Sequence, residues 1–357
     1  MNVYRQTVSY GRIFFLLVPL ILVAVVGVQV LKNQWESAAR LASTHNTVSR
    51  LLDTHDTNLH LSSDYRDQDG DLIADPPTDL TQCINPVELN FSYIASSDGD
   101  APQDTWRELI AALAKKLDRK VNLVSYSDTG EQLRALRNGQ LHITALSTGT
   151  VPTGVNADGF VPVCTLGRAD GSYGYTMKII VPADSDIQKV EDIRGHRMTF
   201  TRPRSNSGYK AALVLLMDNY NMQIERDYDW GFSYGHDNSI RRVASHEFEA
   251  AAVASDLLDR MVARGEIKAD SIRSIYESEK FPPGAIGFAY NLIPALRTGI
   301  RAVLLNFDWS GTGLEKEFGP TGATQFVPIS YKDDWGNVRR IDTALMKARQ
   351  SMKLATP

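Results

Sequence analysis

The chain has 357 residues, of which 43% are hydrophobic and 22% charged, values typical of a globular protein with one large or two medium domains. A formal net charge of -4 without a long basic run argues against a nucleic-acid-binding protein. The only two cysteines, Cys83 and Cys164, exclude a disulfide-rich scaffold and a cysteine-based zinc site, although they could pair in an oxidising compartment.

An apolar segment at residues 13–31 is long enough to span a bilayer. Arg5 and Arg12 precede it, which favours a cytoplasmic N-terminus at residues 1–12 and export of the following chain. We predict an uncleaved transmembrane signal anchor, which places the main domain in the periplasm or outside the cytoplasmic membrane. A cleaved signal peptide is the alternative, but its apolar core would be shorter. Residues 32–63, with a thin apolar stripe, are predicted to form a stalk helix.

An acidic linker at residues 64–86 separates the stalk from the main domain. Its Asp67, Asp69, Asp71 and Asp75 resemble the calcium loops of thrombospondin type 3 and dockerin-like repeats, in which hard oxygen ligands converge on one ion. A structural Ca²⁺ site is one interpretation of this segment. A solvated acidic tether is the other, and no other cofactor is expected.

Strand-like and helix-like segments alternate from residue 87 onward. The expected strands are 87–95, 121–126, 141–146, 176–182, 198–201, 230–234, 249–254, 271–276 and 285–290. The expected helices are 103–117, 130–137, a segment ending near 220, 236–244, 255–264, 292–307 and 342–353. This alternation predicts an α/β fold built from βαβ units with mostly parallel sheets.

The alternation also predicts two lobes joined by two crossing strands. Residues 87–180 would form the first part of lobe 1, residues 181–280 would form lobe 2, and residues 281–357 would return to lobe 1 and add C-terminal helices. Such a protein binds ligands between its lobes, outside the carboxyl ends of the strands.

The segment 199–216 is predicted to form a strand, a tight loop and a helix. Ser205, Asn206 and Ser207 are all good N-cap residues for that helix. A helix N-terminus presents free backbone N–H groups and partial positive charge, so it attracts anions. Arg202 adds positive charge beside the turn. The pattern indicates either an oxyanion pocket or an ordinary capped helix.

The order of motifs from residue 87 to about 331 resembles the phosphonate/phosphite/phosphate-type substrate-binding proteins of ABC transporters, which are type 2 periplasmic binding proteins. The segments that carry the resemblance are 169–175, 190–195, the anion loop 199–208, 235–243 and the second hinge crossing 282–284. The resemblance covers about two thirds of the chain. It implies a two-lobed binding protein with hinge strands and not an enzyme.

The resemblance also implies a ligand and a set of contacts. A tetrahedral phosphorus oxyanion would bind between the lobes and be delivered to ABC permease and ATPase subunits. Ser205, Asn206 and Ser207 would hold it through hydroxyl groups and helix-end N–H groups. His236 would donate a further hydrogen bond, because it also begins a helix directly after a strand. Tyr175 would contribute a hydroxyl group from the other lobe.

Departures from the family pattern bear on the ligand. Asp256 falls where the family can place an acid that faces the ligand. However, Asn206 replaces a threonine, Arg202 replaces an acid, and the segment before Ala285 lacks the acid found in amine-recognising members. These differences weaken an aminoalkylphosphonate as the ligand and favour phosphate, phosphite or a small phosphonate.

Two other functions are compatible with the same residues. A membrane-tethered oxyanion sensor would use the same site and signal through a partner protein. A serine hydrolase would use Ser207, His236 and Asp256 as a triad, but Ser207 does not lie in a G-x-S-x-G elbow. We therefore expect a binding protein.

Overall fold

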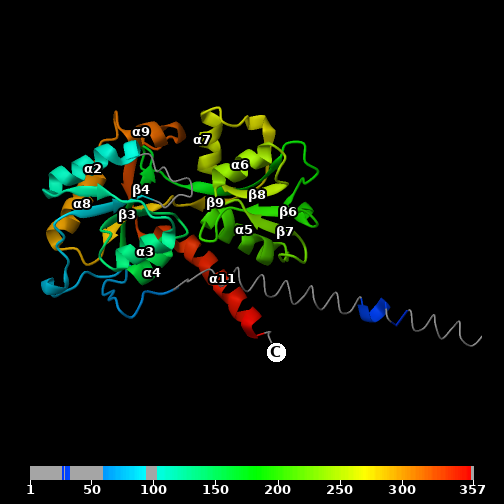
Figure 1. Ribbon diagram of the computed structural model, residues 1–357, viewed down its shortest axis with the longest axis horizontal. Coiled ribbons are helices and arrows are strands. Elements are labelled where there is room, and N and C mark those ends of the chain that lie inside the picture. Colours follow the sequence, from blue (N-terminus) through cyan, green and yellow to red (C-terminus); the bar gives the residue numbers. More distant parts are fainter. Residues whose placement is uncertain (1–25, 28, 33–58, 94–102, 355–357) are drawn as a thin grey trace, which may run out of the picture. The chain divides into compact units, whose positions relative to one another are not determined.

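The computed structural model describes residues 26, 27, 29–32, 59–93 and 103–354 (Figure 1). The expected signal anchor and stalk lie almost entirely outside these residues, although residues 26, 27 and 29–32 are helical. In the described part of the chain, no helix combines the length and the apolar character needed to cross a bilayer. The chain divides into Met1–Arg50 and Leu51–Pro357, and the fold below is that of the second unit.

Lobe 1 is built on a six-stranded sheet in the order β11-β4-β10-β3-β1-β2. β1 pairs in parallel with β2 and β3, whereas β10 runs antiparallel between β3 and β4. The strands are β1 (Leu89–Ser92), β2 (Val121–Leu123), β3 (Ile143–Leu146), β4 (Phe160–Gly167), β10 (Ala285–Ala289) and β11 (Gln325–Pro328). The expectation of a parallel sheet therefore holds for the first three strands, and the antiparallel strands are those beside the connections between the lobes.

Helices cover the sheet of lobe 1 (Figure 1). In α2, the residues Trp106, Leu109 and Leu113 recur on one helical face, and each has an exposed fraction of 0–1%. The Trp106 ring packs against Phe91 of β1, with ring centroids 5.4 Å apart. The helices of this lobe are α2 (Gln103–Leu117), α3 (Thr129–Arg137), α4 (Val151–Asp158), α8 (Pro294–Asn306) and α9 (Gly313–Phe318), followed by the 3₁₀ turn η6 (Gly319–Thr321).

Lobe 2 is built on a five-stranded sheet in the order β7-β6-β8-β5-β9. β6 pairs in parallel with β7 and β8, and β5 is antiparallel to β8 and β9. The strands are β5 (Tyr175–Pro182), β6 (Arg197–Phe200), β7 (Asp229–Phe232), β8 (Ala250–Ala254) and β9 (Ile272–Phe281). Its helical segments are η2 (Val190–Ile193), η3 (Asn206–Lys210), α5 (Ala211–Val214), η4 (Leu215–Asn219), α6 (His236–Ala244), α7 (Ser255–Ala263) and η5 (Ala269–Ser271).

The chain crosses between the sheets at residues 168–174 and 282–284. The expected division between residues 180 and 181 falls inside β5, which pairs along its whole length in the sheet of lobe 2. The structure also contains α4 and β4, between the expected strands 141–146 and 176–182, where no helix or strand was predicted. Pro162 makes the sequence of β4 look unlike a strand, because proline has no backbone N–H group to donate to a neighbouring strand. The register of the β10–β4 pairing shifts at this point.

The acidic segment is packed onto lobe 1. The Tyr65 ring lies edge-on to Tyr290, with centroids 4.9 Å apart, and Ala74 is buried. Lys332 Nζ donates to Gly70 O at 2.9 Å. A 3₁₀ turn, η1 (Leu80–Gln82), follows. The alternative prediction of a solvated tether is therefore wrong for this segment, because Tyr65 and the buried Ala74 pack it against lobe 1.

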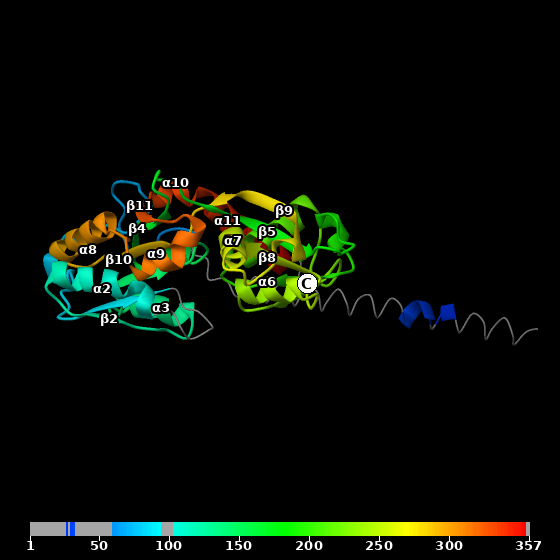
Figure 2. The ribbon, with the colours of Figure 1, turned by 90° about the horizontal axis from the view of Figure 1, so that it is seen from above.

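The C-terminal helices extend from lobe 1 to lobe 2. After β11, the chain forms α10 (Tyr331–Asp334) and α11 (Gly336–Leu354). α11 packs against η3 and α5 of lobe 2 (Figures 1 and 2). Lobe 1 and lobe 2 are thus linked by two covalent crossings and by the packing of this third element.

Candidate functional site

The anion loop has the conformation of a capped helix start. Ser205 is the N-cap of the π-helical turn η3, and its Oγ accepts a hydrogen bond from Gly208 N at 3.1 Å. A Cβ atom at Gly208 would overlap the Thr201 side chain, so glycine is required for the loop to approach β6. π-Helical turns are uncommon and occur frequently at functional sites.

Asn206 is the most informative residue of this loop. Its exposed fraction is 2%, yet neither its carboxamide nitrogen nor its oxygen has a hydrogen-bond partner among the described residues. A buried polar group without a partner is costly, and a bound ligand is one way to satisfy it. Ser207, the next residue, is 1% exposed. The helix start therefore holds unused hydrogen-bonding capacity away from bulk water.

His236 begins α6 and lies next to Ser205. Its Nε2 is 3.2 Å from Ser205 Oγ, and its Nδ1 accepts a hydrogen bond from Ala254 N at 3.1 Å. The acceptor role of Nδ1 places the ring proton on Nε2. Burial, assisted by the charge of Arg202, lowers the pKa of His236 to about 4, so the ring is neutral at physiological pH.

Tyr175 lies at the start of β5 and connects lobe 2 to lobe 1. Its hydroxyl donates to Thr148 Oγ1 at 3.2 Å, and Thr148 Oγ1 donates to Pro282 O at 2.9 Å. Burial raises the pKa of the Tyr175 hydroxyl, while interactions with Thr148, Ser207 and Asn206 act in the opposite direction. Tyr175 thus lies near the anion loop, but the prediction that it comes from the other lobe was wrong, because β5 belongs to the sheet of lobe 2, as does β6, which leads into the anion loop.

Asp256 lies in the first turn of α7. Burial raises its pKa, an effect that Arg260 opposes. Its negative charge also contributes to the raised pKa of Tyr175. The structure brings together five of the six residues predicted for the oxyanion site: Ser205, Asn206, Ser207, Tyr175 and His236. Their contacts with a ligand remain predictions.

The geometry does not match a hydrolase triad. His236 hydrogen bonds with Ser205 rather than with Ser207. In a triad the second ring nitrogen donates to a carboxylate, whereas here Nδ1 accepts from the backbone N–H of Ala254. A histidine in this arrangement has no acid to orient it as a general base.

Sequence reasoning missed the part of lobe 1 that contacts the anion loop. Residues 147–150 follow the buried strand β3, and Thr148 is 5% exposed. A Cβ atom at Gly149 would overlap Arg204 O and would lie 2.8 Å from Asn206 N. The hydroxyl-rich sequence Ser-Thr-Gly-Thr after a strand was the available signal, since it parallels Ser-Asn-Ser-Gly in the anion loop.

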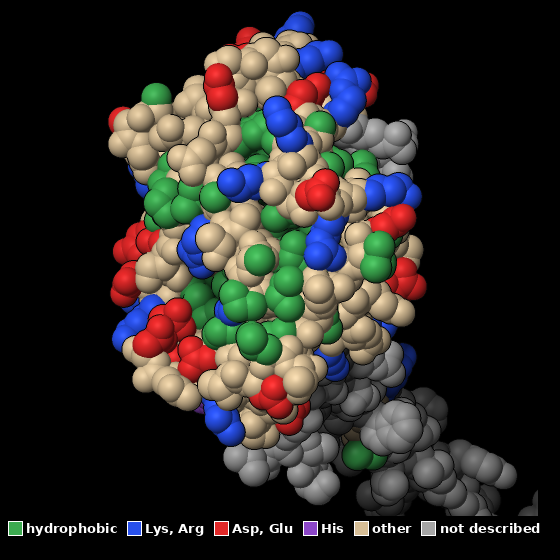
Figure 3. Space-filling model, turned by 90° about the vertical axis from the view of Figure 1, so that its left-hand side faces the viewer, with side chains coloured by type: hydrophobic (Ala, Val, Ile, Leu, Met, Phe, Trp, Pro, Cys, Tyr) green, Lys and Arg blue, Asp and Glu red, His purple; other side chains and the backbone are tan. Residues whose placement is uncertain are grey.

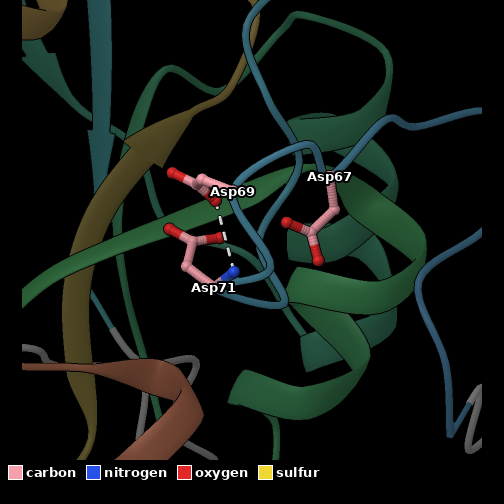
Figure 4. A group of neighbouring side chains, drawn as sticks. All are labelled: Asp67, Asp69 and Asp71. Atoms are coloured by element: carbon pink, nitrogen blue, oxygen red, sulfur yellow. Dashed lines mark hydrogen bonds between the residues drawn. The ribbon is translucent and has the colours of Figure 1, made fainter.

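Three of the four predicted calcium ligands lie together. Asp67, Asp69 and Asp71 place one oxygen each within 4.8 Å of one another (Figure 4). Asp75 Oδ2 instead accepts a hydrogen bond from Gln68 N at 2.8 Å. Burial and the neighbouring carboxylates raise the pKa of Asp71, which a hydrogen bond from Ile73 N opposes. This cluster of carboxylates has the chemistry for Ca²⁺, and the ion itself remains a prediction.

A cavity of about 580 Å³ lies beside the acidic segment, between it and α8. Its lining includes the carboxylates of Asp69 and Asp71, the guanidinium groups of Arg297 and Arg301, and apolar residues such as Phe288. None of the predicted oxyanion-binding residues lines it. The face of the molecule in Figure 3 has apolar side chains at its centre and charged side chains of both signs around them.

The two sheets, their crossings and the helix starts near one another define a two-lobed binding protein with the type 2 periplasmic fold. The sequence model of a family described as ABC transporter, phosphonate, periplasmic substrate-binding protein matches residues 91–335. The chain belongs to this family, which confirms the resemblance and makes it a member of a group of transport proteins rather than enzymes.

One curated relative is the phosphonates-binding periplasmic protein of Escherichia coli K12. It is 25% identical over 224 residues, which cover 61% of this chain and 66% of the relative. The chain thus spans just under two thirds of the length of that relative.

Solved structures share the fold. A binding protein component of an ABC phosphonate transporter from Pseudomonas aeruginosa gives a TM-score of 0.63 at 16% identity, covering 76% of this chain and 90% of that chain. PhnD1 from Prochlorococcus marinus in complex with methylphosphonate gives a TM-score of 0.60 at 18% identity, covering 74% of this chain and 100% of that chain.

Proposed function

We propose that this chain is an extracytoplasmic solute-binding protein that captures a small phosphonate, phosphite or phosphate for an ABC permease and its ATPase. The observation that carries the proposal is the buried, unpartnered carboxamide of Asn206 at the start of η3. A tetrahedral oxyanion would accept hydrogen bonds from this group, from the Ser205 and Ser207 hydroxyls and from helix-end N–H groups. Membership of the family supports the transport role.

The charge of the site favours an anion that is held mainly by neutral donors. His236 is neutral because burial depresses its pKa to about 4, and its one N–H group is directed at Ser205 Oγ, so it brings no charge to the site and acts on the anion through Ser205. The raised pKa of Asp256 favours its protonated form, in which it could donate to or accept from a protonated oxyanion. Methylphosphonate, which one structural neighbour binds, is therefore the first ligand to test.

The apolar segment at residues 13–31 would anchor the protein to the inner membrane as a single-pass helix. This part of the proposal rests on the sequence. Fractionation of membranes from expressing cells tests it, since alkaline extraction releases a protein that has no integral anchor.

Isothermal titration calorimetry of the full chain in detergent tests the ligand. Methylphosphonate, phosphite and phosphate are titrated separately. Binding of at least one of them is expected, and no heat with any of the three would contradict the proposal. Asn206→Asp places a negative charge at the expected ligand position and should abolish binding. Asn85→Asp, the same substitution at an exposed residue whose side chain accepts from Arg119, should leave it unchanged.

A further inference from the structure

The side chain of Lys210 is buried at the junction of three elements. Lys210 is the last residue of η3, and its exposed fraction is 1%. Its Nζ donates to Gly149 O of lobe 1 at 2.8 Å and to Asp342 Oδ1 of α11 at 2.8 Å. One ammonium group thus joins the helix of the anion loop, the opposing loop of lobe 1 and the C-terminal helix.

Asp342 is equally buried. Its exposed fraction is 1%, and its second oxygen, Oδ2, has no partner among the described residues. A buried ion pair costs desolvation that is recovered only when its geometry is good, so it is weak evidence for added stability. A buried ion pair can instead specify one arrangement of the elements that carry the charges.

A second bond holds the start of this helix to lobe 1. Trp335, which directly precedes α11, is fully buried, and its Nε1 donates to Thr148 O at 3.0 Å. Thr148 is also the acceptor for the Tyr175 hydroxyl. α11 is therefore fixed to lobe 1 by Trp335 at its start and paired with Lys210 of lobe 2 through Asp342.

We propose that Lys210 is a positioning residue for oxyanion binding, and that α11 supplies its counter-ion and so holds lobe 1 against the anion loop. This inference rests on the proposed function for its link to affinity, but the contact between the lobes can be measured without a ligand. We call the arrangement in which lobe 1 contacts the anion loop the closed arrangement. If the ligand binds only this arrangement, a decrease in the fraction of closed molecules weakens the apparent affinity by the same factor.

The test is the double variant Lys210→Met/Asp342→Leu, which removes both charges while keeping apolar bulk. Single variants would leave one buried charge unpaired and could fail to fold. The matched control is Lys120→Met/Glu88→Leu, at an exposed ion pair of 3.1 Å within lobe 1. Melting curves establish that both double variants fold.

The readout is the distance between spin labels on Lys116→Cys in α2 and Glu191→Cys in η2, in the full chain with Cys83→Ser. Double electron–electron resonance is measured without ligand. The distance distribution should be broader and shifted to longer distances in Lys210→Met/Asp342→Leu, and unchanged in the control. Distances like those of the wild type would overturn the proposal. Methylphosphonate affinity should fall about tenfold if the closed fraction falls to about a tenth.

The two measurements separate the two proposals. If the wild type binds none of the three oxyanions but the distances still lengthen, the ligand assignment fails and the role of Lys210 and α11 stands. If the wild type binds an oxyanion and the distances do not change, the role of Lys210 and α11 fails.

Discussion

His236 donates to Ser205, and the backbone of β8 determines this direction. Because Ala254 N–H donates to Nδ1 of His236, the ring proton resides on Nε2, 3.2 Å from Ser205 Oγ. The same Oγ accepts from Gly208 N. With two donors directed at it, the hydroxyl oxygen can still donate its own proton. Ser205 is thereby oriented as a donor, which is what an oxyanion requires.

The pH dependence of stability should report the neutral state of His236. Its pKa is about 4 in the folded chain and about 6.5 in an unfolded one, so the unfolded state binds more protons between these values. The contribution of His236 to the free energy of unfolding is therefore present above pH 6.5 and is lost as the pH falls towards 4.

The variant His236→Asn should not show this decrease in the free energy of unfolding at low pH, because asparagine does not titrate. Its Oδ1 can replace Nδ1 of His236 as the hydrogen-bond acceptor. Chemical denaturation of both proteins from pH 4 to 7 measures the difference. Parallel pH profiles of the two proteins would show that the pKa of His236 is not lowered in the folded protein.

Ser207→Ala should weaken phosphonate binding while the fold remains intact. Ser207 is buried at the start of η3, and a lost hydrogen bond to a charged ligand costs about 1.5–3 kcal/mol. Calorimetry with methylphosphonate measures the change, with Ser245→Ala at the exposed end of α6 as the control. An unchanged affinity would move the site elsewhere. Ester turnover that disappears in Ser207→Ala would favour the hydrolase.

Gly149→Ala should separate the lobes at the anion loop. The added methyl group would overlap Arg204 O, and Gly149 does not have the positive φ that would strain an alanine. We therefore expect a normal melting temperature together with a larger radius of gyration in small-angle scattering and weaker oxyanion binding. Gly336→Ala, where an added Cβ meets nothing within 4 Å, is the control. Scattering identical to that of the wild type would contradict the expectation.

Calcium should stabilise the acidic segment if Asp67, Asp69 and Asp71 bind it. Binding to the folded state alone would add about 2.7 kcal/mol at a concentration of 100 times Kd. The expected results are a higher melting temperature and slower proteolysis near residue 70, both reversed by chelator. Asp71→Asn should remove the effect, whereas Asp118→Asn, an exposed residue of lobe 1, should keep it. Indifference of the wild type to chelator would refute the calcium site.

The regular parts of the fold were predictable because their residues repeat a clear pattern. The bounds expected for 103–117 and 236–244 match α2 and α6, where apolar spacing and N-terminal signals agree. β4 was missed because Pro162 and the surrounding glycines indicate a loop. β9 extends to Phe281, beyond the expected residue 276, because it pairs with β5 through polar residues that give no strand pattern.

The candidate site was predictable where local sequence determines geometry. Ser205 is an N-cap and His236 begins a helix, and both properties can be read within a few residues. The contacts of Lys210 could not be predicted, since Asp342 is 132 positions away and neither residue belongs to a motif. Thr148 was missed for the same reason, because its partners come from β5, from the second crossing and from the residue before α11.

The two crossings between the lobes differ in how much they can bend. The crossing at 282–284 contains Pro282 and Pro283, whose rings fix two backbone torsions. The crossing at 168–174 contains Gly171 and Gly174 with φ values of 80° and 122°. The crossing with two prolines therefore has less backbone freedom than the crossing with two glycines. A change in the angle between the lobes would be accommodated mainly by residues 168–174.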